Sequence, residues 1–337
     1  MPKETRLTQH KRWMRLALEL AQKGKLLTSP NPMVGACVVR AGKLVSSGYH
    51  QKYGGDHAEV IALKKAGARA RGATLYVTLE PCSTWGKTPP CTAAVLNAGI
   101  KEVIVGSFDP NPRNHGTGIR ALKKEGIRVI ANVLSGEVEK QNEAFFKYVK
   151  TRLPFITLKM AQSLDGKIAT YKGLSRWISS PASREFVHRL RAEQDAILVG
   201  GNTLRLDDPL LSPRLSKKNG GLIPAGKPWR VALDKDFKTP ASARIFKGNQ
   251  LTFLAVSEKR IHARREKKSF TLIPVAEKKG RLDLKELLRK LADLGVAKLL
   301  VEGGGELAWS LINEKLVDKI FWIVAPKILG VRTPRLR

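Results

Sequence analysis

The stretches HAEV (57–60) and TLEPCSTWGKTPPC (78–91) decide the fold of the first half of this chain, because they carry His57, Cys82 and Cys91. In proteins zinc is bound by imidazole nitrogen and thiolate sulfur, and a catalytic zinc site keeps its fourth position open for water. One histidine and two cysteines satisfy both conditions. We therefore predict that His57, Cys82 and Cys91 are zinc ligands.

Glu59 follows His57 by two residues, on the first turn of a predicted helix. Both side chains can approach the same bound water there, and the carboxylate can take the proton of that water and pass it on. Zinc deaminases that act on nucleobases have a non-ligand glutamate in H-x-E and a later P-C-x-x-C. Pro81 precedes Cys82 as in that pattern, although eight residues separate the two cysteines. The pattern predicts a zinc-dependent deaminase with Glu59 as the catalytic proton shuttle.

Three other interpretations fit some of these residues. Cys82 and Cys91 could be small core residues, as we expect for Cys37 inside the strand ACVV. A structural zinc module that binds nucleic acid would need a fourth protein ligand, and His50 and His115 match no ligand pattern. A deaminase of free nucleosides or of nucleobases in RNA is a further alternative, which the net charge of +32 favours.

Strands and helices alternate along both halves of the chain, which is typical of layered α/β domains. In the first half we predict strands at 36–40, 44–50, 74–81, 101–110 and 127–134, and helices at 10–24, 57–67, 91–99 and 118–126. Residues 136–154 are predicted to form one helix that leads into a domain boundary. Further apolar strands follow within 155–169, 195–204, 228–234, 251–257 and 297–305. We predict one domain over residues 1–150 and a second over residues 151–337.

Composition indicates the cellular compartment and the kinds of partner to expect. The 337 residues include three cysteines, too few for a disulfide framework, and no signal peptide or membrane-spanning stretch is evident. These features predict a cytoplasmic protein. The 61 Lys+Arg residues are spread along the chain without alternating aromatic residues, which argues against a nucleic-acid partner.

Several motifs together resemble one family, the bifunctional deaminase/reductases of riboflavin biosynthesis. The matching stretches cover nearly the whole chain in the same order: SPNPMVGA (29–36), HAEV (57–60), TLEPCSTWGKTPPC (78–91), DPNP (109–112), LKMAQSLDGKIAT (158–170), RWISS (176–180), ILVGGNTLRLDDPLL (197–211), VEGGGELA (301–308) and FWIVAPKILG (321–330). The resemblance implies a cytidine-deaminase-like three-layer α/β/α domain followed by a dihydrofolate-reductase-like α/β domain. It also implies two reactions: deamination of 2,5-diamino-6-(5-phosphoribosylamino)pyrimidin-4(3H)-one, then reduction of the ribosyl chain by NADPH.

The resemblance also implies site residues. Asn31 is expected to hold the deaminase substrate near the zinc. The NADPH site is expected to comprise Ala161, Trp177, Thr203, Asp207, Gly303, Gly304 and Gly305. The reductase substrate, a phosphorylated pyrimidine, is expected to contact Ser175, Arg191, Leu211, Arg214 and Glu302. Lys159 and Asp207 are further candidates for contact with the ribose. Glycine backbones and arginine side chains both suit phosphate oxygens. The family also suggests a homodimer or a homotetramer.

Two departures from the family pattern carry expectations of their own. Thr84 stands where the family usually has histidine, in PCSH, so altered substrate contacts are expected while deaminase chemistry is retained. The sequence ends in APKILGVRTPRLR, where family members usually continue to a final strand pair. An edge of the reductase sheet is therefore expected to expose apolar surface and unpaired backbone groups, weakening that domain.

Overall fold

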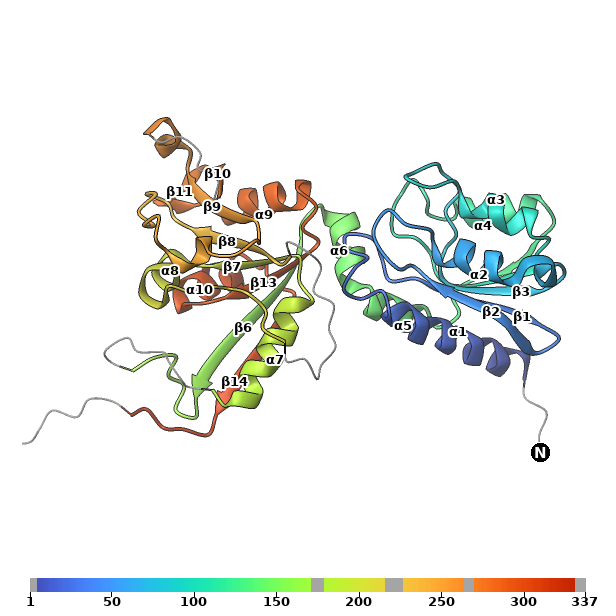
Figure 1. The fold of residues 1–337 in the computed structure, drawn as a ribbon, viewed down its shortest axis with the longest axis horizontal. Helices are drawn as coiled ribbons and strands as arrows, with labels where there is room; N and C mark the ends of the chain where they lie inside the picture. Colours follow the sequence, from blue (N-terminus) through green and yellow to red (C-terminus); the bar gives the residue numbers. More distant parts are fainter. Residues whose placement is uncertain (1–4, 171–178, 216–226, 264–269, 331–337) are drawn as a thin grey trace, which may run out of the picture. The chain divides into compact units, whose positions relative to one another are not determined.

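The computed structural model of the protein describes residues 5–170, 179–215, 227–263 and 270–330, with only the backbone at 261–263. The chain divides into two compact units, Met1–Arg152 and Leu153–Arg337. Figure 1 shows the elements of each unit, which are described separately below. Two residues expected in the reductase site, Ser175 and Trp177, lie outside the described residues.

The first unit is built on a five-stranded sheet in the order β2-β1-β3-β4-β5. Strand β1 is antiparallel to both of its neighbours, whereas β3, β4 and β5 are parallel. The strands are β1 (Gly35–Arg40), β2 (Lys43–Tyr49), β3 (Thr74–Leu79), β4 (Glu102–Ser107) and β5 (Arg128–Ile130). Gly42 has φ of +73° and lies in the turn between β1 and β2.

Helices cover both faces of this sheet (Figure 1). Helices α1 (Arg6–Gln22) and α5 (Ser135–Gln141) lie on one face, and α2 (Ala58–Ala66), α3 (Cys91–Asn97) and α4 (Thr117–Lys124) lie on the other. A short 3₁₀ turn, η1 (Gly67–Ala70), follows α2. Met14 of α1 packs in one apolar cluster with Cys37 and Tyr76, while Leu63 of α2 packs in another with Leu75. The three-layer arrangement and the burial of Cys37 are as predicted.

The single helix predicted over 136–154 is wrong, because the chain breaks at Asn142 into α5 and α6 (Glu143–Thr151). Asn142 has φ of −110° and ψ of 23°, which is not helical. Its buried side-chain amide accepts a hydrogen bond from Met33 N (2.8 Å) and donates one to Met33 O (3.0 Å). These two bonds to the turn that carries Asn31 replace helical continuity.

The second unit contains a seven-stranded sheet in the order β10-β9-β8-β7-β13-β6-β14. All of its neighbouring pairs are parallel. The strands are β6 (Phe155–Ser163), β7 (Ala196–Val199), β8 (Trp229–Leu233), β9 (Thr252–Ser257), β10 (Thr271–Val275), β13 (Lys298–Glu302) and β14 (Lys319–Ala325). A small hairpin is formed by β11 (Glu277–Lys278) and β12 (Arg281–Leu282).

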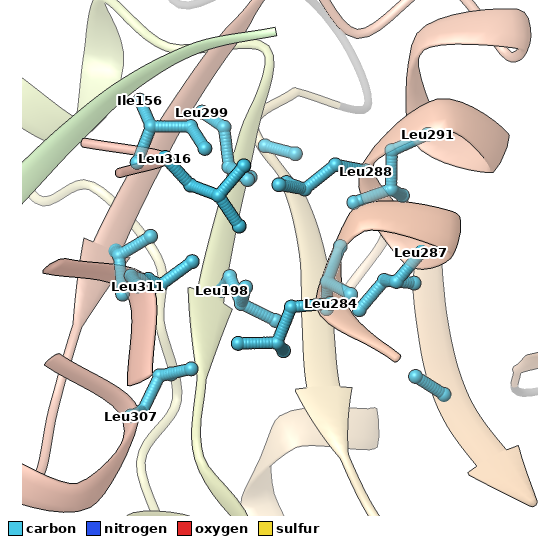
Figure 2. Close-up of a cluster of buried hydrophobic side chains, with 14 of the residues drawn as sticks. Ile156, Leu198, Leu284, Leu287, Leu288, Leu291, Leu299, Leu307, Leu311 and Leu316 are labelled. Carbon is cyan, nitrogen blue, oxygen red and sulfur yellow. The ribbon is translucent and has the colours of Figure 1, made fainter. Parts of the chain in front are cut away.

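The core of the second unit lies on both faces of its sheet. Figure 2 shows leucines of α9 (Leu284–Asp293) and α10 (Gly305–Asn313) directed toward Ile156, Leu198 and Leu299 of the strands. On the opposite face, Leu190 of α7 (Pro181–Ala192) and Leu204 of α8 (Gly201–Asp207) share a cluster with Ile197 and Leu300. Two 3₁₀ turns complete the unit, η3 (Arg244–Phe246) and η4 (Glu258–Ala263). Consecutive residues of β7 (Ile197 and Leu198) and of β13 (Leu299 and Leu300) pack on opposite faces of the sheet. Both strands are therefore buried on both sides.

Strand β14 is an edge strand of this sheet, paired with β6. Its alternate side chains Ile320, Trp322 and Val324 are 45%, 50% and 50% exposed. The unit therefore carries an exposed apolar stripe along one strand. Among the described residues, no helix is both long enough and apolar enough to cross a membrane.

Candidate active sites

The three predicted zinc ligands come together in the first unit. Nδ1 of His57 lies 3.1 Å from Sγ of Cys91 and 3.6 Å from Sγ of Cys82. All three ligand atoms lie within 4.8 Å of one another. Two ligands bonded to one tetrahedral zinc, with Zn–N of about 2.0 Å and Zn–S of about 2.3 Å, would be about 3.5 Å apart. The cluster needs little adjustment to surround a zinc ion.

Helix starts position these ligands. His57 is the residue before α2, and Cys91 is the first residue of α3. Cys82 follows the end of β3, and its loop is held against α3 because Cys82 O accepts a hydrogen bond from Thr92 N (3.2 Å). Cys91 N also donates to Cys82 Sγ (3.4 Å). The start of α3 thus favours a thiolate at Cys82.

The protonation of the cluster reflects its mutual contacts. The hydrogen bond with Cys82 raises the pKa of His57 to about 9, although burial opposes the shift. The hydrogen bond from the Cys91 thiol lowers the pKa of Cys82 to about 4, and that same bond, with burial, raises the pKa of Cys91. These shifts favour protons on His57 and Cys91 where a cation would bind, so a metal bound to these atoms must displace them.

The donor set fits a zinc ion with an open position. Among the described residues the cluster has three ligands, not the four of a closed structural site. The two other histidines considered lie in different contacts: His50 Nδ1 bonds to Asp56 O (3.0 Å), and His115 Nδ1 bonds to Asp109 O (3.0 Å). The geometry favours a catalytic site over a structural zinc module.

Glu59 lies beside this cluster and lines a cavity. Its side chain is 3% exposed, and burial raises the pKa of its carboxyl group. The cavity has a volume of about 200 Å³, and Glu59, His57 and Cys82 all line it together with Asn31. A carboxyl group beside an open metal position, facing a cavity of this kind, is suited to proton transfer.

Asn31 is held at the cavity by His50, a residue for which we predicted no role. Asp56 O can only accept, so His50 Nδ1 carries a proton and donates to it. Burial lowers the pKa of His50, which leaves its Nε2 unprotonated as an acceptor for Asn31 Nδ2 at 3.2 Å. The amide of Asn31 is thereby oriented, and its Oδ1 remains as an acceptor for a ligand N–H.

Buried carboxylates organise other loops that line the cavity. Glu80 is 4% exposed and accepts hydrogen bonds from Gly116 N (2.8 Å) and Ile119 N (3.2 Å) at the start of α4. Asp109 accepts from Asn114 Nδ2 (2.9 Å), and Thr84 donates to Asn114 Oδ1 (2.9 Å). Thr84 therefore contacts the cavity wall through Asn114, at the position where the family pattern has histidine.

In the second unit, the predicted cofactor residues Thr203, Gly303 and Gly304 come together. They follow β7 and β13, adjacent parallel strands whose carboxyl ends share one edge of the sheet. Gly304 N donates to Thr203 Oγ1 (3.0 Å). Gly303 has φ of +139°, which favours glycine, and a Cβ atom there would lie 2.9 Å from Thr203 Oγ1 and displace that side chain. Such an edge is where open α/β sheets bind ligands.

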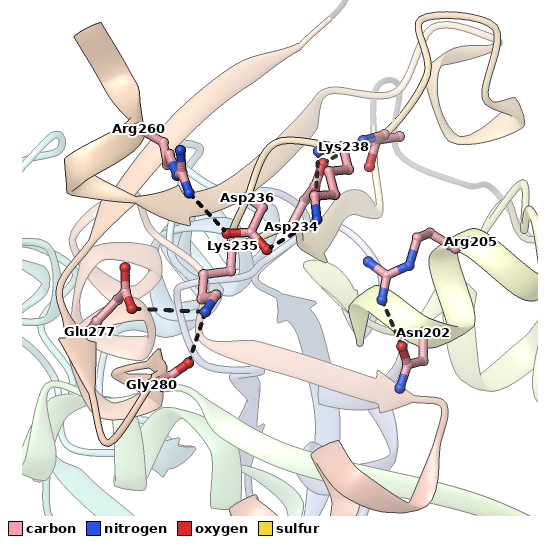
Figure 3. A network of polar contacts seen from close by, with 10 residues as sticks. Asn202, Arg205, Asp234, Lys235, Asp236, Lys238, Arg260, Glu277 and Gly280 are labelled. Carbon is pink, nitrogen blue, oxygen red and sulfur yellow. Dashed lines mark hydrogen bonds and ion pairs between the residues drawn. The ribbon is translucent and has the colours of Figure 1, made fainter. Parts of the chain in front are cut away.

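Basic side chains border the same edge after β8. Figure 3 shows Lys235 and Lys238 in polar contacts after β8, and Arg205 in a separate contact with Asn202. Asp234 fixes the loop by accepting hydrogen bonds from Lys238 N (2.9 Å) and Thr239 N (2.8 Å). Lys235 Nζ donates to Gly280 O (3.0 Å), and Arg205 Nη2 donates to Asn202 Oδ1 (2.6 Å). The two lysines also face carboxylates, with Lys235 Nζ 3.9 Å from Glu277 Oε2 and Lys238 Nζ 3.8 Å from Asp236 Oδ2, so much of their charge is balanced locally.

Two predicted substrate residues of the second unit bind each other. Arg191 donates through Nε to Glu302 Oε1 (2.5 Å) and through Nη2 to Glu302 Oε2 (2.9 Å). Burial raises the pKa of Glu302, but the charge and hydrogen bonds of Arg191, with the charges of Lys159 and His188, together outweigh burial, so the net shift is downward. Lys159 is paired in register with Glu302 on the next strand. Arg191 thus serves first to fix Glu302.

The other residues expected near this site lie in the following contacts. Leu211 is buried with φ of +54°, and Arg214 N donates to His188 Nδ1 (3.2 Å). Ala161 lies near the carboxyl end of β6, and Asp207 is the last residue of α8. We predicted no site role for His188. Its position three residues before Arg191 is visible in the sequence and, for residues on a helix, could have indicated that the two side chains are neighbours.

Comparison with known proteins agrees with this architecture. Residues 7–107 match the cytidine and deoxycytidylate deaminase zinc-binding region, and residues 154–337 match the RibD C-terminal domain. The riboflavin biosynthesis protein RibD of Aquifex aeolicus is 45% identical over 95% of this chain and 88% of its own length. RibD of Escherichia coli is 40% identical over 94% of this chain and 88% of its own.

Solved structures agree as well. Acinetobacter baumannii RibD superposes with a TM-score of 0.84 at 35% identity, covering 96% of this chain and 88% of its own. A diaminohydroxyphosphoribosylaminopyrimidine deaminase/5-amino-6-(5-phosphoribosylamino)uracil reductase from Thermotoga maritima gives 0.85 at 36%, covering 97% and 89%. Fold and site therefore define a two-part protein, a zinc-type deaminase unit followed by a reductase unit, with the α/β folds that were expected. The chain belongs to the RibD family of riboflavin biosynthesis proteins.

Proposed function

We propose that this chain catalyses two consecutive steps of riboflavin biosynthesis. The first unit removes the 2-amino group of 2,5-diamino-6-(5-phosphoribosylamino)pyrimidin-4(3H)-one, and the second reduces the ribosyl chain of the product to a ribityl chain. The observation that carries the proposal is the convergence of His57, Cys82, Cys91 and Glu59 on one cavity. Full-length likeness to RibD supports the pairing with a reductase.

In the deaminase unit, His57, Cys82 and Cys91 would hold zinc, which supplies a hydroxide nucleophile at neutral pH. Glu59 takes the proton of the attacking water and delivers protons to the ring nitrogen and to the leaving amine. The bond from ring carbon to amine breaks, a carbon–oxygen bond replaces it, and ammonia leaves. Asn31, oriented by His50, accepts a hydrogen bond from an N–H of the ring. Such an acceptor favours a pyrimidinone ring that presents an N–H.

In the reductase unit, NADPH would supply the hydride that opens the ribose ring. The loop Gly303–Gly305 and Thr203 would hold its phosphates at the carboxyl edge of β7 and β13, with Ala161 and Asp207 beside it; Trp177 is proposed from the family pattern alone. Arg214 and Leu211 would hold the phosphorylated pyrimidine, Arg191 would fix Glu302, and Ser175 is likewise proposed from the pattern. Lys159, one strand from Glu302, would face the ribose.

Metal content and the two activities test this assignment together. Cys91→Ser should lower the zinc content and ammonia release together, and leave NADPH oxidation with the already deaminated substrate unchanged. Cys37→Ser is the matched control, because Cys37 is buried on β1 away from the cluster. Full zinc content in Cys91→Ser, or loss of zinc in Cys37→Ser, would contradict the assignment of ligands.

The proposal also includes an oligomeric state and a cellular location. The exposed stripe of Ile320, Trp322 and Val324 supports assembly into a homodimer or homotetramer, which sedimentation can test. Three free cysteines and the use of NADPH support a cytoplasmic location.

A further inference from the structure

Arg230 is a fully buried charged side chain to which no role has been assigned. It lies on β8 and is 1% exposed. Among the described residues its guanidinium contacts neutral oxygen atoms and no carboxylate: Ile245 O (2.6 Å), Ser212 Oγ (2.8 Å), Lys247 O and Gln250 Oε1. A buried charge without a counter-charge is costly, so these contacts of Nη1 and Nη2 matter, the more because the buried Nε has no hydrogen-bond partner among the described residues.

One of those neighbours lies in the middle of the segment that carries the proposed substrate residues. Ser212 Oγ accepts from Arg230 and donates to Gln250 Oε1 (3.1 Å). The backbone carbonyl of Ser212 also accepts from Arg191 Nη1 (3.4 Å), the arginine that fixes Glu302. Ser212 therefore connects the buried guanidinium to the Arg191–Glu302 pair.

The segment around Ser212 depends on such outside contacts. Leu211 has φ of +54°, in the left-handed region that leucine rarely adopts. On the other side, Arg214 N is held by His188 Nδ1. Arg230 itself is anchored to the carbonyls of Ile245 and Lys247, at and directly after η3. Among the contacts of the segment, the one through Arg230 connects Ser212 to the backbone at η3.

We infer that Arg230 is a positioning residue of the reductase, which acts through Ser212 to hold Leu211 and Arg214 where the phosphorylated pyrimidine binds. The inference rests on the proposed reductase function. Arg230 does not touch the substrate, so its loss should weaken substrate binding more than turnover.

The test compares Arg230→Lys, Ser212→Ala and their double variant in the full chain. Each single variant should raise the KM for the deaminated substrate about tenfold, the order expected for a lost buried hydrogen bond. The kcat and the KM for NADPH should change less than about twofold on the same reasoning. The KM of the double variant should not exceed the higher KM of the two single variants, because both substitutions remove the same Arg230–Ser212 hydrogen bond. Ammonia release should be unchanged in all of them, which confirms that the first unit is intact.

Thr252→Val is the matched control. Its hydroxyl bonds to Ile245 O (3.2 Å), the carbonyl that Arg230 also holds, but does not contact Ser212. This variant should lower the melting temperature without raising the KM. Additive effects of Arg230→Lys and Ser212→Ala, an unchanged KM in Ser212→Ala, or an equal rise in Thr252→Val would overturn the inference.

Hydrogen exchange separates this inference from the proposed function. The non-proline amides of residues 208–215 should exchange about tenfold faster in Arg230→Lys and Ser212→Ala, and at the wild-type rate in Thr252→Val. Wild-type protein that oxidises no NADPH would refute the reductase proposal, whereas unchanged exchange in this segment would refute the role of Arg230.

Discussion

Arg191 and Glu302 form a two-pronged ion pair, in which Nε and Nη2 of the guanidinium lie 2.5 Å and 2.9 Å from the two carboxylate oxygens. The two side chains are 15% and 9% exposed, and 111 positions separate them in the chain. The pair joins the end of β13 to α7. Each residue thereby depends on the other for its charge partner.

Removing one member of this ion pair should lower the free energy of unfolding more than replacing both members with apolar residues. Glu302→Leu leaves the Arg191 charge buried and should destabilise the second unit by about 3–5 kcal/mol. The double variant Arg191→Met/Glu302→Leu should recover much of that loss, since no unpaired charge remains. Urea unfolding followed by a probe in the second unit measures both. A double variant less stable than Glu302→Leu would contradict this description of the pair.

Acid should destabilise the second unit through His188. Burial, with the charges of Arg191 and Arg214, lowers the pKa of His188 to about 4 from its ordinary 6.5. Between these values the unfolded chain binds more protons than the folded one, so stability should fall as pH falls from about 6.5 to about 4. His188→Gln should flatten that part of the stability profile. An imidazole NMR titration with a midpoint near 6.5 would exclude this origin.

Asn142→Ala should weaken both the fold and the substrate site of the first unit. The variant loses two hydrogen bonds to Met33, and we expect a loss of about 2–3 kcal/mol in unfolding free energy. Because Met33 follows the turn of Asn31, the KM for the diaminopyrimidine should also rise. Asn142→Asp keeps the acceptor for Met33 N and should lie between wild type and Asn142→Ala. Wild-type KM and stability in Asn142→Ala would show that the broken helix plays no such part.

His50→Leu separates orientation of Asn31 from metal binding. The variant removes the acceptor for Asn31 Nδ2, so the KM for the diaminopyrimidine should rise about tenfold, as for other lost buried hydrogen bonds. The zinc content should remain that of the wild type, because His50 is not among the three clustered ligands. Zinc loss in His50→Leu would instead make His50 a ligand and revive the structural-site interpretation.

The zinc cluster could be predicted because its residues are chemically distinctive. Histidine, cysteine and glutamate in these motifs have few other joint uses, and helix starts at His57 and Cys91 are local features. The alternation of strands and helices, from which two layered α/β units were predicted, is also a local feature of the sequence. Both inferences depend on short stretches of sequence.

Features that depend on tertiary contacts could not be predicted. The break at Asn142 arises from bonds to Met33, 109 positions away, against a good local helix pattern. The strand predicted over 127–134 ends at Ile130, because Asn132 and Leu134 adopt left-handed backbone angles. The partnership of Arg191 with Glu302 likewise appears only once β13 and α7 are in place.

The central claim is tested most directly by ammonia release from the zinc-loaded protein with 2,5-diamino-6-(5-phosphoribosylamino)pyrimidin-4(3H)-one. Wild type should release ammonia and then oxidise NADPH, and Glu59→Gln should bind zinc fully yet lose ammonia release by about 10²-fold or more, the contribution of general acid–base catalysis. The same variant should still oxidise NADPH when given the deaminated compound. Equal ammonia release by wild type and Glu59→Gln, or none from the zinc-loaded wild type, would contradict the account.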